Sequence, residues 1–330
     1  MPTEELLEVR LCDLDLGIAG SPLEPRLEEL YGELRAAGLG FRPNVWLSTD
    51  WFAPEGVPGF AIPFYLAHPR LARLERQQMF QVEGGDRRWC MQLLRHETGH
   101  AIDCAHRLHY RRAWREHFGR ASAPYRATYV PDPDSRRFVH NLPDFYAQSH
   151  PLEDFAETFA VWLRPGARWR TRYVDWPALR KLVYVDALMA ELADHRPAVR
   201  SRERTDSLPT VRMTLREYYR RKQAHYGRED FSGYDRDLRR LFSDDPSRWR
   251  RKSAAAFLRE RRSHLRRGVA QWTGQHRYVV DEVLKGMIQR SRELGLRVSG
   301  SEREAGEGAA ALVTLHATRI ARMRHREYFR

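Results

Sequence analysis

The sequence predicts an α+β fold that is mostly helical, with a small N-terminal sheet and a helical C-terminal region. Two observations predict it: short segments rich in β-forming residues come early in the chain, and helical patterns fill most of the rest. The chain has 330 residues, of which 42% are hydrophobic and 31% are charged, as in ordinary globular proteins. This length can bury a sizeable core in one large domain or in two.

In the first third of the chain, the patterns predict helices and two strands. The first helix covers residues 23–37 and ends before a glycine. Strands are predicted at about 44–49 and 60–67, where β-forming residues lie between Pro and Gly. The segment PRLARLERQQMF, residues 69–80, fits a short strand or a helix turn equally well. Apolar residues recur on one face from about 88 to 109, which predicts a longer helix.

The middle of the chain is predicted to loop and then to return to helix. Residues 110–150 are mixed, and within them the stretch 122–145, which holds four prolines, should be extended and looping. A helix begins at Pro151, a residue that suits the first helical turn, and it ends near 164–166. Another helix is predicted at 177–193. The polar residues 194–210 contain two prolines and are predicted to form a linker.

The rest of the chain is predicted to be a basic helical region without internal repeats. Its helices are expected at about 214–226, 234–242, 246–266, 276–294 and 309–326. The segment SGSEREAGEG, residues 299–308, is predicted to be an exposed loop.

Positive charge is concentrated in this last region. Residues 201–330 carry 31 basic and 17 acidic side chains, whereas residues 1–100 carry 10 and 15. Such an excess indicates nucleic acid or an acidic partner. However, 53 of the 57 basic residues are arginine, which a biased genome composition also explains. The charge alone therefore does not decide the partner.

The cysteines indicate a reducing compartment. Cys90 and Cys104 are predicted on one helix, roughly 21 Å apart, which is too far for a disulfide. With Cys12 they make an odd count and no zinc-ribbon spacing, so all three are interpreted as core thiols. The N-terminus lacks an apolar signal core, and no apolar run could span a membrane. These features predict a cytoplasmic protein.

A candidate metal motif lies in the segment RHETGHA, residues 95–101. His96 and His100 are four residues apart and therefore share one face of a helix. Glu97 is next to them and can reach a water molecule on the same ion. Alone, the motif also fits a helix that merely carries two histidines, so a third ligand is required.

Two third ligands are possible. His106 would suit the metzincin spacing, but the glycine that turns that chain is here Asp103, and on an unbroken helix His106 faces away. The second possibility is the segment HPLEDFAETFA, where Glu153 and Glu157 share one helix face. One carboxylate can bind zinc while the other bonds the far nitrogen of a ligand histidine. Asp154 could replace Glu153 as the third ligand.

These motifs together resemble the gluzincin arrangement, HExxH followed by ExxxD/E. The chain resembles a bacterial family of zinc-binding metallopeptidases, whose motif runs much like YAQSHPLEDFAETFAVWL. The spacing is also similar to that of the anthrax lethal factor catalytic domain. The resemblance covers about residues 90–163 and implies a zincin-like fold with one zinc ion per chain. It places the ligands at His96, His100 and Glu153.

The resemblance also assigns the supporting roles. Glu97 matches the general base, which would take a proton from a zinc-activated water. Glu157 matches the acid that supports a ligand histidine. Tyr146, seven residues before Glu153, matches the tyrosine that assists the transition state in lethal factor. His150 begins the second helix and is interpreted as a cap or loop residue rather than a ligand.

The first hypothesis is a zinc metallopeptidase, a hydrolase with a catalytic domain at 1–193, a linker at 194–210 and a basic helical region at 211–330. That region can pack on the catalytic domain as one unit, and its charge suggests acidic peptide substrates. The alternative is a protein that binds nucleic acid or an acidic partner through the basic helices, with a structural or vestigial zinc site. A third hypothesis keeps the zinc but hydrolyses a non-peptide amide.

Overall fold

The computed structural model describes residues 2–125, 129, 131–193, 195–227, 234–248 and 250–324. It divides into two compact units. Unit 1 contains residues 1–76 and 82–217, and unit 2 contains residues 77–81 and 218–330. The division falls within α3 and α9. None of the helices in the described part of the chain combines the length and the hydropathy needed to cross a bilayer.

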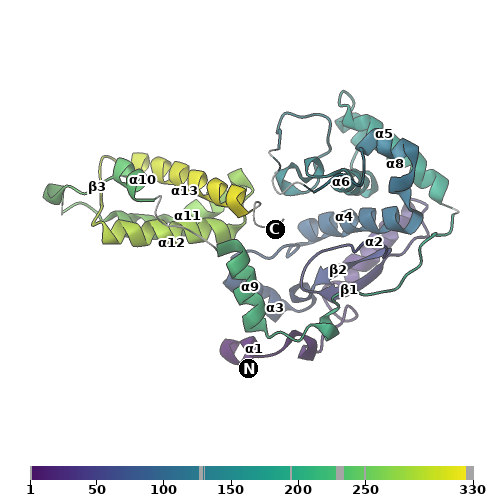
Figure 1. Ribbon diagram of the computed structural model, residues 1–330, viewed down its shortest axis with the longest axis horizontal. Coiled ribbons are helices and arrows are strands. Elements are labelled where there is room, and N and C mark those ends of the chain that lie inside the picture. The colour runs from purple at the N-terminus through teal and green to yellow at the C-terminus, as the bar shows by residue number, and fades with distance from the viewer. Residues whose placement is uncertain are drawn as a thin grey trace. The chain divides into compact units, whose positions relative to one another are not determined.

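Unit 1 is built from helices and one small sheet. Its elements are α1 (Thr3–Leu7), α2 (Glu24–Ala36), β1 (Asn44–Ser48), β2 (Gly59–Pro63), α3 (Pro69–Met79), α4 (Arg87–His106), α5 (Arg112–Phe118), α6 (Pro151–Leu163), α7 (Trp169–Arg172) and α8 (Ala178–Leu192). In Figure 1, α4 lies between α6 on one side and α2 with the sheet on the other. This central helix carries the metal motif.

The sheet of unit 1 is a parallel pair, in which Asn44 pairs with Gly59 and Ser48 with Pro63. Unit 1 also includes the segment predicted as a linker, except Asp194, which lies outside the described residues. Side chains at alternate positions of β1 donate hydrogen bonds to backbone oxygens of this segment. The bonds run from Asn44 to Glu203, from Trp46 to Thr205 and from Ser48 to Asp206. Alternate residues of a strand share one face, so one face of β1 binds residues 203–206 of this segment.

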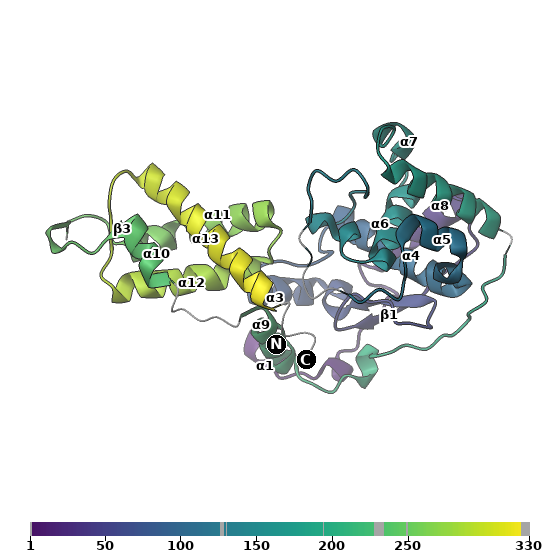
Figure 2. The same ribbon diagram turned by 45° about the horizontal axis from the view of Figure 1, so that its top comes forward.

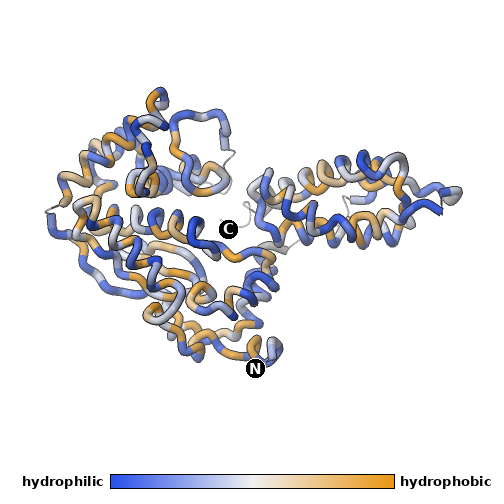
Figure 3. The backbone as a smooth tube through the Cα atoms, turned by 180° about the vertical axis from the view of Figure 1, so that it is seen from behind, coloured by the Kyte–Doolittle hydropathy of each residue, from blue (hydrophilic) through white to orange (hydrophobic). Residues whose placement is uncertain are grey.

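Unit 2 packs helices around an apolar core. Its elements are α9 (Leu215–Gly227), α10 (Tyr234–Leu241), β3 (Phe242–Ser243), α11 (Ala254–Thr273), α12 (Arg277–Glu293), β4 (Arg297–Val298) and α13 (Glu302–Arg324). Strands β3 and β4 are antiparallel. Figures 1 and 2 both show α11, α12 and α13 side by side, and Figure 3 shows apolar and polar residues alternating along them. Leu258, Val280 and Val313 are among the fully buried residues between these helices.

The prediction of a mostly helical chain with a small N-terminal sheet is confirmed. The undecided residues 69–80 form α3 up to Met79. The helix expected up to residue 109 ends at His106, because Arg107 takes a left-handed conformation with φ of 52°. The helix expected at 246–266 begins only at Ala254, where the Ser253 side chain caps it.

The prediction of a loop at residues 299–308 is wrong, because α13 begins at Glu302. Ser301 Oγ accepts a hydrogen bond from the Glu304 backbone N–H, and the Glu304 carboxylate accepts one from the Ser301 N–H. This reciprocal pair is a capping box, which satisfies two donors at a helix start. The sequence contains the capping-box pattern S-x-x-E at Ser301 and Glu304, but the acidic and glycine-rich composition of the segment favoured the prediction of a loop.

The cysteines are all free. Cys90 is buried, as the prediction of a core thiol requires, whereas Cys12 and Cys104 are partly exposed.

Candidate metal centre

Helix α4 presents both histidines of the motif on one face. The helix is capped by Asp86, whose carboxylate accepts a hydrogen bond from Trp89 N–H at 2.9 Å. One turn of helix separates His96 from His100, and their Nε2 atoms lie 3.2 Å apart. His96 is only 3% exposed. Both rings therefore offer a nitrogen at one point below the surface.

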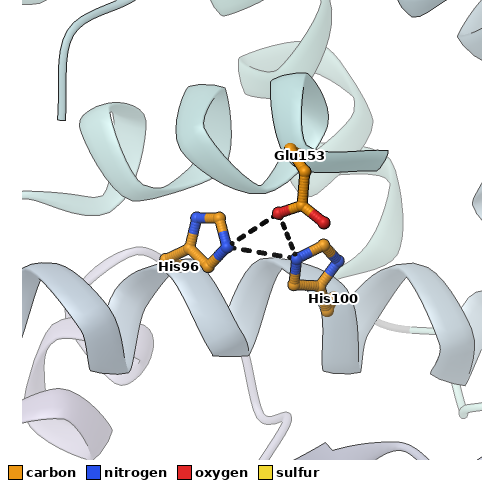
Figure 4. A group of neighbouring side chains, drawn as sticks. All are labelled: His96, His100 and Glu153. Carbon is orange, nitrogen blue, oxygen red and sulfur yellow. Dashed lines mark hydrogen bonds and ion pairs between the residues drawn. The ribbon is translucent and has the colours of Figure 1, made fainter. Parts of the chain in front are cut away.

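Helix α6 supplies a carboxylate to the same point. Glu153 lies in its first turn, and Oε2 is 3.1 Å from the Nε2 atoms of both His96 and His100. Figure 4 shows the two imidazoles of α4 pointing toward this carboxylate. The three residues form a group that could hold a metal ion.

The spacing of these atoms fits a tetrahedral metal. Zinc–nitrogen and zinc–oxygen bonds of about 2.0–2.1 Å place neighbouring ligand atoms about 3.3 Å apart in a tetrahedron. The three distances here are 3.1, 3.1 and 3.2 Å. Two imidazoles and one carboxylate are also a donor set that zinc accepts while keeping a fourth position open. The residues present therefore fit zinc.

A glycine within the motif brings the two helices this close. A Cβ atom added at Gly99 would lie 2.8 Å from Cα and 3.2 Å from Cβ of Ala156 on α6. Real Cβ atoms essentially never approach backbone that closely. Gly99 therefore permits the approach of α4 and α6 that puts Glu153 beside His96.

Glu157, one turn after Glu153, supports the site from behind. Its Oε1 lies 2.9 Å from Nδ1 of His96, and the residue is buried. The Asn141 side chain and the Leu142 N–H each donate to this carboxylate at 2.8 Å. With Nδ1–H donating to Glu157, the other nitrogen of His96 keeps its lone pair for a metal. No pattern in the sequence marks the donors at 141 and 142.

The electrostatics of the group favour a cation. Burial alone would lower the pKa of His96, but the hydrogen bonds with Glu153 and Glu157 outweigh it and raise this pKa well above its usual range. Burial alone would raise the pKa of Glu153, but His100 and His96 bring it well below the usual range. The carboxylate is therefore charged and draws positive charge onto its neighbours.

The two predicted catalytic side chains lie near the histidines. Glu97 follows His96 on α4 and is 6% exposed, and burial raises the pKa of its carboxyl. Tyr146 comes from a short 3₁₀ helix, Pro143–Gln148, and its ring centre is 5.6 Å from that of His96. Burial, together with the charges of Glu153 and Glu97, raises the pKa of Tyr146 well above its usual range. Tyr146 is therefore a protonated donor.

The alternative ligands are occupied elsewhere. The Asp154 carboxylate lies 2.5 Å from Nζ of Lys181, and burial raises the pKa of Asp154 to about 7. His106 packs edge-on against Phe41 with ring centres 6.5 Å apart. His150, expected to be a cap or a loop residue, caps α6: its Nδ1 accepts a hydrogen bond from the Leu152 N–H.

A tyrosine at the site was also not predicted. The hydroxyl of Tyr125 donates a hydrogen bond to Glu153 Oε1 at 2.8 Å. It lies in the looping segment between the two motif helices, where no periodic pattern marks individual side chains.

Residues 73–172 match the model of a family described as "Putative zinc-binding metallo-peptidase". The match includes α4 and α6 and hence His96, His100 and Glu153. The predicted resemblance to zinc-binding metallopeptidases is confirmed for these residues, which are less than a third of the chain. No curated protein and no solved structure matches the chain.

Proposed function

We propose that the chain is a zinc-dependent metallopeptidase with a zincin-like catalytic core, and that His96, His100 and Glu153 are the metal ligands. The observation that carries the proposal is the convergence of three donor atoms at 3.1–3.2 Å from two separate helices. The buried Glu157 behind His96 adds to it, because ligand histidines need such a partner. The similarity of residues 73–172 to metallopeptidases supports the same reaction class.

The chain's own residues supply the acid, base and hydrogen-bond donors of the reaction. A bound zinc ion acts as a Lewis acid that polarises a carbonyl and acidifies water. Glu97 accepts a proton from the attacking water and passes it to the nitrogen of the departing amine. Tyr146 donates a hydrogen bond to the carbonyl oxygen as negative charge develops there. Glu157 keeps the proton of His96 on Nδ1, away from the metal side.

Metal content of matched variants tests the ligand set. We expect the wild type to bind one zinc ion per chain by mass spectrometry. Glu153→Ala should lose it, whereas Glu97→Gln should keep it and lose peptide hydrolysis by at least about 100-fold, the usual contribution of a general base. If Glu153→Ala still bound one zinc ion per chain, the assignment of Glu153 as the third ligand would be wrong. If the wild type took up no zinc when supplied with it, the proposal of a zinc-dependent metallopeptidase would be wrong.

The remaining details of the substrate stay predictions. An acidic substrate is suggested by the basic C-terminal region, and it is tested by comparing cleavage of acidic and neutral peptides of equal length. If only the neutral peptides were cleaved, the prediction of an acidic substrate would be wrong. The cytoplasmic location likewise stays a prediction, and it rests on the cysteines.

A further inference from the structure

The two oxygens of Glu153 have different partners. Oε2 faces His96 and His100, whereas Oε1 accepts the hydrogen bond of the Tyr125 hydroxyl at 2.8 Å. A carboxylate can bind a metal through one oxygen or through both. Because Oε1 is engaged by a phenol, Oε2 is the oxygen that is turned toward the histidines. The hydrogen bond thus selects how Glu153 can bind.

Tyr125 is itself held in place by His150. The two rings are stacked, with centres 3.7 Å apart and planes at 12°. His150 is buried, and its two nitrogens are both used. Nδ1 accepts the Leu152 N–H at the start of α6, so Nε2 carries the proton and donates to the Ala123 oxygen at 2.7 Å. One side chain therefore ties residues 123 and 125 to the helix that carries Glu153.

Building on the proposed metallopeptidase function, we propose that Tyr125 is a positioning residue that fixes Glu153 as a one-oxygen metal ligand, and that His150 anchors Tyr125. A phenol has a single O–H to donate. In Tyr125 that proton is given to Glu153, so it is not available for a substrate oxygen. Tyr146, next to His96, is left as the donor to the substrate. The two tyrosines thus have separate tasks.

Zinc affinity, measured without substrate, tests the role of Tyr125. A chromophoric chelator that competes for zinc gives the affinity of each variant. Tyr125→Phe keeps the ring but loses the hydroxyl, and we expect zinc to bind about 10–100-fold more weakly, as is typical when a partner of a ligand is removed. Tyr110→Phe is the matched control: that ring is 66% exposed, and zinc affinity should not change.

The outcomes separate this inference from the proposed function. Equal zinc affinity in Tyr125→Phe and the wild type would overturn the role of Tyr125 and leave the metallopeptidase proposal intact. A wild type that binds no zinc would remove the proposed function itself. Circular dichroism of each variant confirms that it is folded.

A comparison of the two tyrosines tests the division of tasks. Tyr125→Phe should regain most of its turnover when zinc is raised to saturation. Tyr146→Phe should bind zinc as the wild type does, and its kcat should stay low at any zinc concentration. If kcat of Tyr125→Phe remained low at saturating zinc, Tyr125 would act on the substrate, and the assignment would be wrong.

A double-mutant cycle tests the anchor. His150→Asn keeps a good helix cap but loses the stacking on Tyr125. If His150 acts through Tyr125, the zinc affinity of the double variant should match that of Tyr125→Phe rather than the sum of both effects. Independent, additive losses would overturn the role of His150.

Discussion

Two buried acidic sites, one in each unit, have different partners. In unit 2, Asp281 has no exposed surface, and its carboxylate accepts hydrogen bonds from Arg262 and Arg266 of α11. In unit 1, Glu153 and Glu157 are also buried, but their partners among the described residues are imidazoles and neutral donors. A buried carboxylate needs positive charge nearby. Arg262 and Arg266 supply it to Asp281, whereas the group of Glu153, His96 and His100 could hold a metal ion that supplies it.

The same contrast holds between neighbours within α6. Asp154 follows Glu153 in the sequence and is also buried, yet its carboxylate lies 2.5 Å from the Lys181 ammonium. Asp154 is therefore compensated by the chain itself. The partner of a buried carboxylate, more than its burial, separates a structural acid from a candidate ligand.

The largest predicted effect is on the compensated acid of unit 2. Asp281→Ala leaves Arg262 and Arg266 without their partner, and we expect the free energy of unfolding to fall by about 3 kcal/mol. Zinc affinity should stay at the wild-type value, because the acid belongs to the other unit. Urea denaturation and zinc titration measure the two quantities. Glu307→Ala, which removes an exposed ion pair with Arg303, is the control and should cost under about 0.5 kcal/mol.

A second prediction compares one helix glycine from each unit. Gly99→Ala forces a methyl group against the Ala156 backbone, so α4 and α6 must separate, and we expect a loss of about 2 kcal/mol together with weaker zinc binding. Gly268→Ala in α11 meets nothing within 4 Å and should stabilise the protein by roughly 0.5–1 kcal/mol. Thermal denaturation measures both. A harmless Gly99→Ala would show that the close helix contact is not required.

These contrasts also mark how far the sequence can predict the site. His96, His100, Glu153 and Glu157 follow from helical spacing, because the helix converts separations of four residues into shared faces. Tyr125 does not, since a loop has no such period and its contact with Glu153 depends on how the whole segment folds back. Gly99 stands within the motif, but the need for a glycine there comes from a helix more than fifty residues later.

The smallest predicted effect concerns a titratable pair on the far end of α4. His109 Nδ1 lies 2.6 Å from the Asp103 carboxylate, and this hydrogen bond raises the pKa of His109 above its usual value, with further help from Glu55. A raised pKa means that the folded state binds the proton more tightly than the unfolded chain. The stabilisation is therefore fully present below about pH 6.5 and is lost as the pH rises through the raised pKa.

Two variants test this pair. Between pH 6 and pH 8 the wild type should lose about 1 kcal/mol of stability relative to His109→Gln, the order of one charge-assisted hydrogen bond that is partly exposed. Asp103→Asn removes the other partner while nearly keeping its shape, and it should flatten the profile in the same way. Urea denaturation at several pH values measures both. Parallel curves of stability against pH for the wild type and the two variants would mean that the pair is too well hydrated to contribute. The hydrogen bond between His109 and Asp103 would then contribute as little to stability as the exposed ion pairs of unit 2.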